Sequence, residues 1–154
     1  MSVVHLLVGL PGAGKTTYAK ALARQGVVRL AVDERVVARH GRLGRDYPES
    51  AHLALLGPVL AEVRRELVEH VRAGRSVVLD HGLGQRAERD EYKRLVTGAG
   101  GTWRLVHFKV ARAELLRRLA ARNADDAVGL ITPEVLDWIA DRSEEPVGEG
   151  EVVV

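Results

Sequence analysis

The chain has 154 residues, of which 46% are hydrophobic and 29% are charged, and these values are typical of one soluble globular domain. Its 23 Lys and Arg residues and 21 Asp and Glu residues leave a net charge of +2, which is too small to indicate nucleic-acid binding by itself. The absence of Cys excludes disulfides and thiolate metal sites, and the lack of a membrane-length apolar run or a secretory signal predicts a cytoplasmic protein without a membrane partner.

Apolar residues alternate along the chain between the spacing of strands and that of helices. In chain order, the pattern predicts a strand at 3–8, a helix at 15–24, a strand at 27–32, a helix that begins at Pro58, a strand at 76–80, a helix at 86–97, a strand at 103–110, a helix at 111–122, a helix that begins at Thr132–Pro133, and a strand at 151–154. This alternation predicts an α/β fold in three layers, a five-stranded parallel sheet with helices on both faces. Residues 40–57 interrupt the pattern, and we interpret them as an insertion within a single domain spanning 1–154.

The most specific motif lies between the first strand and the first helix. Residues 9–16 read Gly-Leu-Pro-Gly-Ala-Gly-Lys-Thr and match the phosphate-binding loop G-x-x-x-x-G-K-[ST] in full. Its glycines let the backbone turn so that N–H groups point at phosphate oxygens, while Lys15 contacts the β- and γ-phosphates and the Thr16 hydroxyl ligates Mg²⁺. We expect the nucleotide to be held by Gly9, Leu10, Pro11, Gly12, Ala13, Gly14, Lys15, Thr16 and Thr17.

Phosphate-binding loops of this type occur in kinases, GTPases, motor ATPases and regulators. The guanine-reading Asn-Lys-x-Asp of GTPases is absent, because Asn123 is the only Asn in the chain and Ala124 follows it. A chain of 154 residues is also short for a motor ATPase. Size and motif together favour a small kinase or a nucleotide-binding regulator.

An acidic residue, Asp33, directly follows the strand predicted at 27–32. Since the carboxyl ends of parallel strands share one edge of a sheet, we expect Asp33 beside the phosphate-binding loop. There its carboxylate could accept the proton of a hydroxyl that attacks the γ-phosphate; alternatively, it caps the helix that follows. Arg35 or Arg39 could hold an anionic acceptor or the oxygens of the transition state.

A second acidic residue, Asp80, ends the apolar strand at 76–80. Such a strand with a terminal acid, in a chain with a phosphate-binding loop, predicts a carboxylate that positions Mg²⁺. The loop that follows presents His81 and, at the start of the next helix, Arg86. Both are candidate substrate-binding residues, although His81 could equally be an ordinary loop histidine and Arg86 part of a solvated helix surface.

Two arginines of the helix predicted at 111–122, Arg118 and Arg122, are four residues apart and therefore share one face. At this place they could close over the triphosphate and neutralise charge in the transition state. The alternative is an arginine-rich surface without a ligand. We interpret residues 117–128 as a short lid.

The phosphate-binding loop, Asp33, Asp80 and the two lid arginines together resemble the small P-loop kinases with a nucleoside-monophosphate-kinase-like fold. The resemblance is greatest to the AAA family ATPases that include zeta toxins, polynucleotide kinases and chloramphenicol phosphotransferases, and it covers about residues 3–146. It implies a sheet of order 2-3-1-4-5, ATP and Mg²⁺ as cofactors, and phosphoryl transfer to a hydroxyl group.

The chain departs from the polynucleotide kinases, which carry Ser-x-Asp-x-x-Arg after the second strand. Here residues 31–35 read Ala-Val-Asp-Glu-Arg, without the serine and with the arginine one position early. We therefore favour an ATP-dependent kinase for a small molecule such as a nucleoside, a sugar or an antibiotic-like alcohol, as a monomer or homodimer, with 40–57 shaping the acceptor site. A polynucleotide 5′-hydroxyl kinase and a nucleotide-binding ATPase switch without an acceptor are the alternatives.

Overall fold

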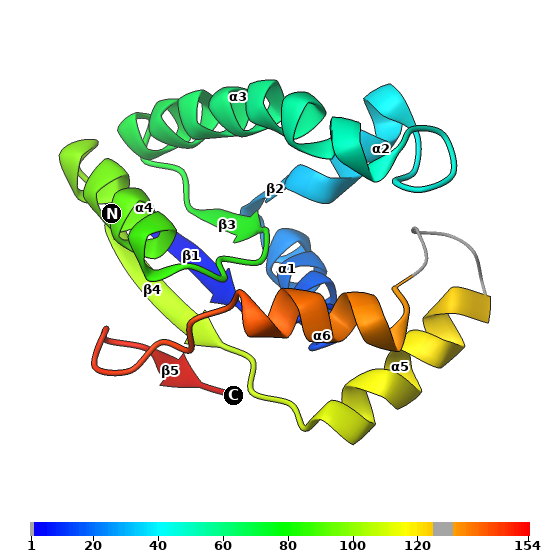
Figure 1. Cartoon of the computed structure of the whole chain (residues 1–154). Coiled ribbons are helices and arrows are strands. Elements are labelled where there is room, and N and C mark those ends of the chain that lie inside the picture. The colour runs from blue at the N-terminus through cyan, green and yellow to red at the C-terminus, as the bar shows by residue number, and fades with distance from the viewer. Residues whose placement is uncertain (1, 125–130) are drawn as a thin grey trace.

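A computed structural model of the chain describes residues 2–124 and 131–154, and its elements are labelled in Figure 1. In this described part, one parallel sheet has five strands in the order β2-β3-β1-β4-β5. The strands are β1 (Val3–Val8), β2 (Val28–Ala31), β3 (Val77–Asp80), β4 (Thr102–His107) and β5 (Val152–Val153). The predicted fold class and strand order are thus confirmed.

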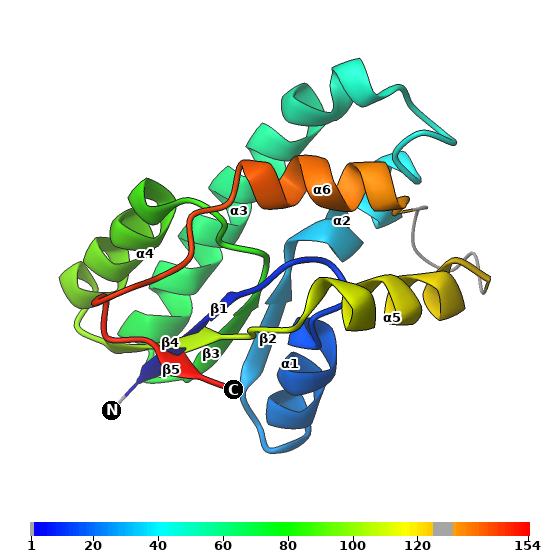
Figure 2. The same ribbon diagram turned by 60° about the horizontal axis from the view of Figure 1, so that its bottom comes forward.

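Helices cover both faces of this sheet. They are α1 (Lys15–Arg24), α2 (Val32–His40), α3 (His52–Arg72), α4 (Arg86–Gly98), α5 (Arg112–Ala124) and α6 (Pro133–Asp141), with a short 3₁₀ turn, η1 (Glu49–Ala51), before α3. In Figure 2, α3 and α4 lie on one face, α1 and α5 lie on the other, and α6 crosses the end of the sheet where β1 enters the loop before α1. Within the described ranges, no helix combines the length and the apolar character that a membrane span requires.

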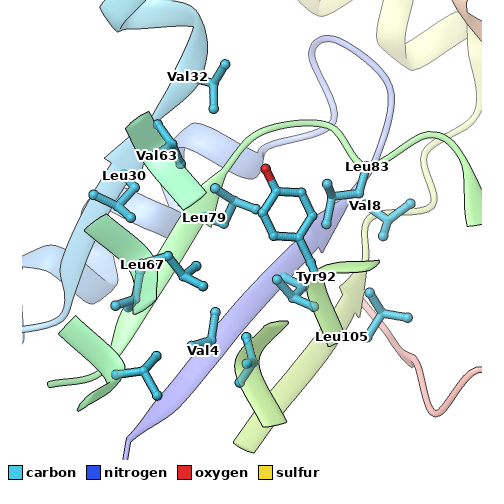
Figure 3. Packing of buried hydrophobic residues seen from close by; sticks show 14 of the residues in the cluster. Val4, Val8, Leu30, Val32, Val63, Leu67, Leu79, Leu83, Tyr92 and Leu105 are labelled. Carbon is cyan, nitrogen blue, oxygen red and sulfur yellow. The ribbon is translucent and has the colours of Figure 1, made fainter. Parts of the chain in front are cut away.

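The core consists of two apolar clusters, one on each face of the sheet. β1 contributes to both because side chains alternate along a strand: Val4, Leu6 and Val8 pack with residues of α3 and α4, and Leu7 packs with residues of α1 and α5. Figure 3 shows the first cluster, in which the fully buried Tyr92 of α4 lies among side chains of the strands. Strands covered on both faces have nearly continuous apolar sequences, which is why the pattern predicted them.

The irregular segment before α3 is shorter than predicted. α3 begins at His52, and Pro58, expected at the first turn, lies inside the helix. A proline usually marks a helix start because it has no N–H to donate, but Leu56 and Leu60, on either side of it, pack against the core. This packing favours a helix that continues through the proline, so the irregular part of 40–57 lies between α2 and η1.

Two strands end earlier than predicted, and two further elements complete the comparison with the prediction. β2 stops at Ala31 because Val32 already opens α2, and β4 ends at His107, before the predicted limit of 110. β5 pairs with β4 of the same chain. The predicted start of α6 is confirmed, since the Thr132 side chain accepts a hydrogen bond from the Val135 amide at 3.2 Å.

A buried ion pair joins α4 to the turn before β5. Arg89 is fully buried, and its Nε and Nη2 atoms donate to the two carboxylate oxygens of Glu149, each at 2.9 Å. Its Nη1 atom donates to the Leu83 carbonyl at 2.9 Å. The Arg89 guanidinium holds the pKa of the Glu149 carboxyl below its ordinary value. The two hydrogen bonds to Glu149 therefore tie α4 to the turn before β5.

Arg89→Met should destabilise the protein by about 3–5 kcal/mol, because it leaves the Glu149 carboxylate buried without its partner. The matched control is Arg112→Met. Arg112 makes the same two-pronged contact, at 2.9 Å to both oxygens of Asp137, but the two side chains are 59% and 49% exposed, so its loss should cost less than about 1 kcal/mol. Urea denaturation followed by circular dichroism measures both, and equal losses would contradict the prediction.

The same pair predicts a dependence of stability on pH. Because the pKa of Glu149 is lowered in the folded state, its stabilising contribution is complete above the unfolded-state pKa of about 4.3 and is lost as the pH falls through the lowered folded value. The free energy of unfolding should therefore fall less steeply with acidification in Glu149→Gln than in the wild type. Parallel curves for the two proteins would show that this carboxyl does not couple folding to protonation.

Candidate active site

The carboxyl ends of β1, β2 and β3 border a cavity of about 650 Å³. Ligands of open parallel sheets bind at this edge, and the volume is typical of a small-molecule site. Most of the residues predicted for the site line the cavity, namely Gly9, Pro11, Gly12, Gly14, Lys15, Thr16, Thr17, Asp33, Asp80, His81, Arg118 and Arg122. Leu10 and Ala13 of the loop do not, because their side chains pack in the cluster beneath α1 and α5.

The phosphate-binding loop leads from β1 into α1. Gly12 and Gly14 have φ angles of 85° and 105°, which residues with a Cβ rarely adopt. Gly12 is also closely packed, since an added Cβ would lie 3.3 Å from the Leu119 side chain of α5. Gly14 is the N-cap of α1 and no side chain caps the helix. The N–H groups of the first turn are therefore available to bind an anion.

Lys15, the first residue of α1, points back into the loop. Its Nζ atom donates to the two carbonyl oxygens at the start of the loop, at 2.5 Å and 3.0 Å. Burial, assisted by the nearby Arg122, lowers the pKa of Lys15 to about 8 against the opposing attraction of Asp33 and Asp80. The ammonium group is thus within electrostatic reach of both carboxylates that the sequence singled out.

Thr16 and Asp80 lie together, as predicted for a metal-binding pair. The Thr16 hydroxyl donates to Oδ1 of Asp80, with 3.3 Å between the oxygens. Oxygen ligands suit Mg²⁺, which usually takes one or two from the protein and completes its shell with phosphate and water. In residues 2–124 and 131–154, no cluster of three or more His, Cys, Asp or Glu side chains forms a separate metal site. The pair therefore fits a Mg²⁺ ion that accompanies a nucleotide.

Asp33 lies in the first turn of α2, where its exposed side chain lines the cavity. It does not cap that helix, because the N-cap is Ala31, and the capping alternative is wrong. Within the described residues Asp33 forms no hydrogen bond or ion pair, unlike the adjacent Glu34, whose two oxygens accept from Arg29 at 2.8 Å and 2.9 Å. The lone pairs of the Asp33 carboxylate are therefore available to a ligand.

The two arginines predicted for the lid reach the cavity from α5. Arg118 donates through Nη1 to the Gly12 carbonyl at 3.2 Å and through Nε to Glu114 at 2.9 Å, so its guanidinium is held at the phosphate-binding loop. The Nε atom of Arg122 is buried and has no partner among the described residues. The lid predicted at 117–128 lies outside the described residues from position 125 onward.

Three arginines predicted to bind substrate do not line the cavity. Arg35 pairs with Glu62, at 2.9 Å, and with Glu66 of α3. Arg39 pairs with Glu62 at 2.6 Å. Arg86 is exposed on α4 and lies 3.8 Å from an aspartate one turn later. Which way a helical residue points depends on the face that packs, and spacing along the chain did not reveal that face.

Several cavity residues were not predicted. Arg29 on β2 donates to Asp80 through Nε at 3.0 Å and Nη2 at 2.6 Å, a contact that only the pairing of β2 with β3 creates. Tyr47 and His52 have stacked rings, with the Tyr47 hydroxyl 2.9 Å from Nδ1 of His52. The one feature of the sequence that pointed to these two residues was their position within 40–57, the segment expected to shape the acceptor site. The predicted His81 also lines the cavity, and its Nε2 atom lies 3.6 Å from a carboxylate oxygen of Glu88 on α4.

Comparisons with known proteins match most of the chain. Residues 4–146 match the family model AAA_33, described as an AAA domain. The chain is 29% identical over 123 residues to a UPF0200 protein of Pyrobaculum aerophilum, an alignment that covers 80% of this chain and 68% of that protein.

Solved structures share the fold. A protein of Chloroflexus aurantiacus, provisionally described as a kinase, has a TM-score of 0.79 at 18% identity, with 99% of this chain and 84% of that chain covered. A chain of the Pnkp1/Rnl/Hen1 RNA repair complex has a TM-score of 0.76 at 18% identity, with 92% and 43% covered. A gluconokinase from Sinorhizobium meliloti has a TM-score of 0.62 at 21% identity, with 99% and 81% covered. Since the family model covers residues 4–146, which include the phosphate-binding loop and most of the chain, the chain belongs to the AAA domain family AAA_33, with a P-loop kinase-like fold.

Proposed function

We propose that the protein is an ATP-dependent phosphotransferase that moves the γ-phosphate of ATP to a hydroxyl group of a small molecule, with Asp33 as the general base. The observation that carries the proposal is the position of Asp33. It is a carboxylate without a described partner, in the same cavity as Lys15 and the Thr16–Asp80 pair. A switch that only binds nucleotide has no need of such a carboxylate opposite its phosphate-binding loop.

Each side chain of the cavity has a role in such a transfer. The N–H groups of the first turn of α1 and the Lys15 ammonium would bind the β- and γ-phosphates. Thr16 and Asp80 would hold Mg²⁺, which neutralises phosphate charge when it is bound. The two lid arginines would neutralise charge that develops on the transferred group. Asp33 would take the proton of the acceptor hydroxyl as its oxygen bonds to phosphorus and the bond to ADP breaks.

The acceptor would lie between α2 and the segment before α3. Val36, Val37 and Leu43 line the cavity here, beside the Tyr47–His52 pair. These mixed apolar and polar walls favour a small acceptor over a nucleic-acid strand, because a small molecule would contact them on several sides. The protein would act as a monomer or as a homodimer. A cytoplasmic location would supply the ATP.

Asp33→Asn should lower kcat by about 10²–10⁴-fold, because the amide cannot accept the proton, and should leave ATP affinity within about twofold of the wild type. The assay is transfer from γ-labelled ATP to a panel of sugars, nucleosides, other small alcohols and 5′-hydroxyl oligonucleotides. Asp90→Asn is the matched control, since Asp90 lies on α4 and does not line the cavity. It should keep full activity.

The same panel separates the rival functions. Label on oligonucleotides, with a strong salt dependence, would replace the small acceptor by nucleic acid. Binding of ATP without transfer to any member of the panel would favour the nucleotide-binding switch. Full turnover by Asp33→Asn would show that another group takes the proton.

ATP affinity should fall as the pH rises above about 8, the pKa of Lys15 in the free site. Bound phosphate favours the charged ammonium and raises this pKa, so binding above pH 8 must take up a proton. Calorimetric titrations in two buffers of different ionisation enthalpy measure that uptake. It should disappear in Lys15→Met and persist in Lys93→Met, whose lysine packs on Trp103 away from the cavity. A wild type that takes up no proton at pH 8.5 would contradict the prediction.

A further inference from the structure

Arg29 connects the metal-binding carboxylate to the helix that carries the proposed base. It lies on β2, and its side chain is only 16% exposed. Two of its N–H groups donate to the same oxygen of Asp80, Oδ2, at 3.0 Å and 2.6 Å. On its other side, Nη1 and Nη2 donate to the two oxygens of Glu34 at 2.8 Å and 2.9 Å. The guanidinium is therefore fixed by one carboxylate on β3 and one in the first turn of α2.

This arrangement leaves the two oxygens of Asp80 in different states. Oδ2 accepts two hydrogen bonds from Arg29, whereas Oδ1 lies 3.3 Å from the Thr16 hydroxyl. A carboxylate held through one oxygen cannot turn about its terminal torsion without breaking both of those hydrogen bonds. Asp80 is thus oriented with a single oxygen toward the phosphate-binding loop.

We propose that Arg29 is a positioning residue, which acts through Asp80 and fixes Oδ1 beside the Thr16 hydroxyl as a preformed oxygen pair for the divalent cation of the nucleotide. This inference rests on the proposed ATP and Mg²⁺ site. Arginine suits the role because its planar fork can donate to two carboxylates at once, whereas an ammonium group is a point charge.

If the role of Arg29 were only to neutralise charge, the expected change in cation affinity would have the opposite sign. If Arg29 only neutralised the charge of Asp80, its removal would leave a stronger anion and increase the affinity for a divalent cation. If Arg29 orients Asp80, its removal leaves the charge but loses the geometry, and the affinity falls. The sign of the change therefore distinguishes the two roles.

The experiment measures Mn²⁺ binding by electron paramagnetic resonance, with the full chain saturated by the non-hydrolysable analogue adenylyl imidodiphosphate. Arg29→Gln should weaken Mn²⁺ binding by about tenfold, the usual effect of losing a group that orients a metal ligand. Arg29→Lys should restore only part of the affinity and leave Mn²⁺ binding about threefold weaker than in the wild type. Asp80→Asn should weaken binding at least as much as Arg29→Gln.

Arg35→Gln is the matched control. Arg35 also bridges two carboxylates, Glu62 and Glu66, but it does not line the cavity. Its loss should change stability without changing Mn²⁺ affinity by more than about twofold. Thermal unfolding of each variant checks that the fold is retained. If Arg29→Gln does not fold, Arg29→Lys decides by itself, since an unchanged Mn²⁺ affinity in that variant overturns the inference.

Unchanged or tighter Mn²⁺ binding in Arg29→Gln would overturn the positioning role, as would binding that does not depend on Asp80. Because the readout requires no phosphoryl transfer, it is independent of the proposed reaction. If the Arg29 variants weaken Mn²⁺ binding as expected but the wild type phosphorylates no acceptor, the positioning role stands and the kinase function fails.

Discussion

The parallel pairing of β2, β3 and β1 is the constraint on which the candidate site depends. The pairings of Ala31 with Asp80 and of Leu6 with Leu79 bring the carboxyl ends of these strands to one edge of the sheet. Each end passes directly into a functional element: the phosphate-binding loop after β1, the Asp33 turn after β2, and Asp80 itself on β3. The apolar packing of the helices that connect the strands therefore stabilises the sheet and positions the site at the same time.

Two arginine–carboxylate pairs show how similar contacts serve different ends. The pair of Arg89 and Glu149 is enclosed on all sides and uses both carboxylate oxygens, so it has no capacity left for a ligand and contributes to stability alone. The pair of Arg29 and Asp80 lies at the cavity and engages only Oδ2. The Asp80 carboxylate is therefore oriented by Arg29 through Oδ2, while Oδ1 makes no contact with Arg29 and can still interact with a cation.

The site also brings unlike charges close together before any ligand is bound. Lys15 lies near Arg122 of α5 and the carboxylates Asp33 and Asp80, and burial outweighs the attraction of the two carboxylates in lowering the pKa of Lys15. A triphosphate would reverse this balance, because it brings negative charge to the ammonium. The links from Arg35 to Glu62 and Glu66 hold α2 against α3, so the helix with Asp33 and the wall of the acceptor side form one packed unit.

The amino-acid sequence by itself determined the parallel α/β architecture, the phosphate-binding loop and the places of Asp33 and Asp80 at strand ends, because these depend on local spacing and on strands buried on both faces. The strand order was implied by the resemblance to small P-loop kinases. The sequence did not reveal that Pro58 lies within α3, that Arg35 and Arg39 pair with α3, or that Arg29 holds Asp80. Each of these depends on which helix face packs and on which strands become neighbours, and such contacts join residues far apart in the chain. Only the tertiary structure decided these contacts, because the packing of the backbone sets the direction in which each side chain points and the residues that it can reach.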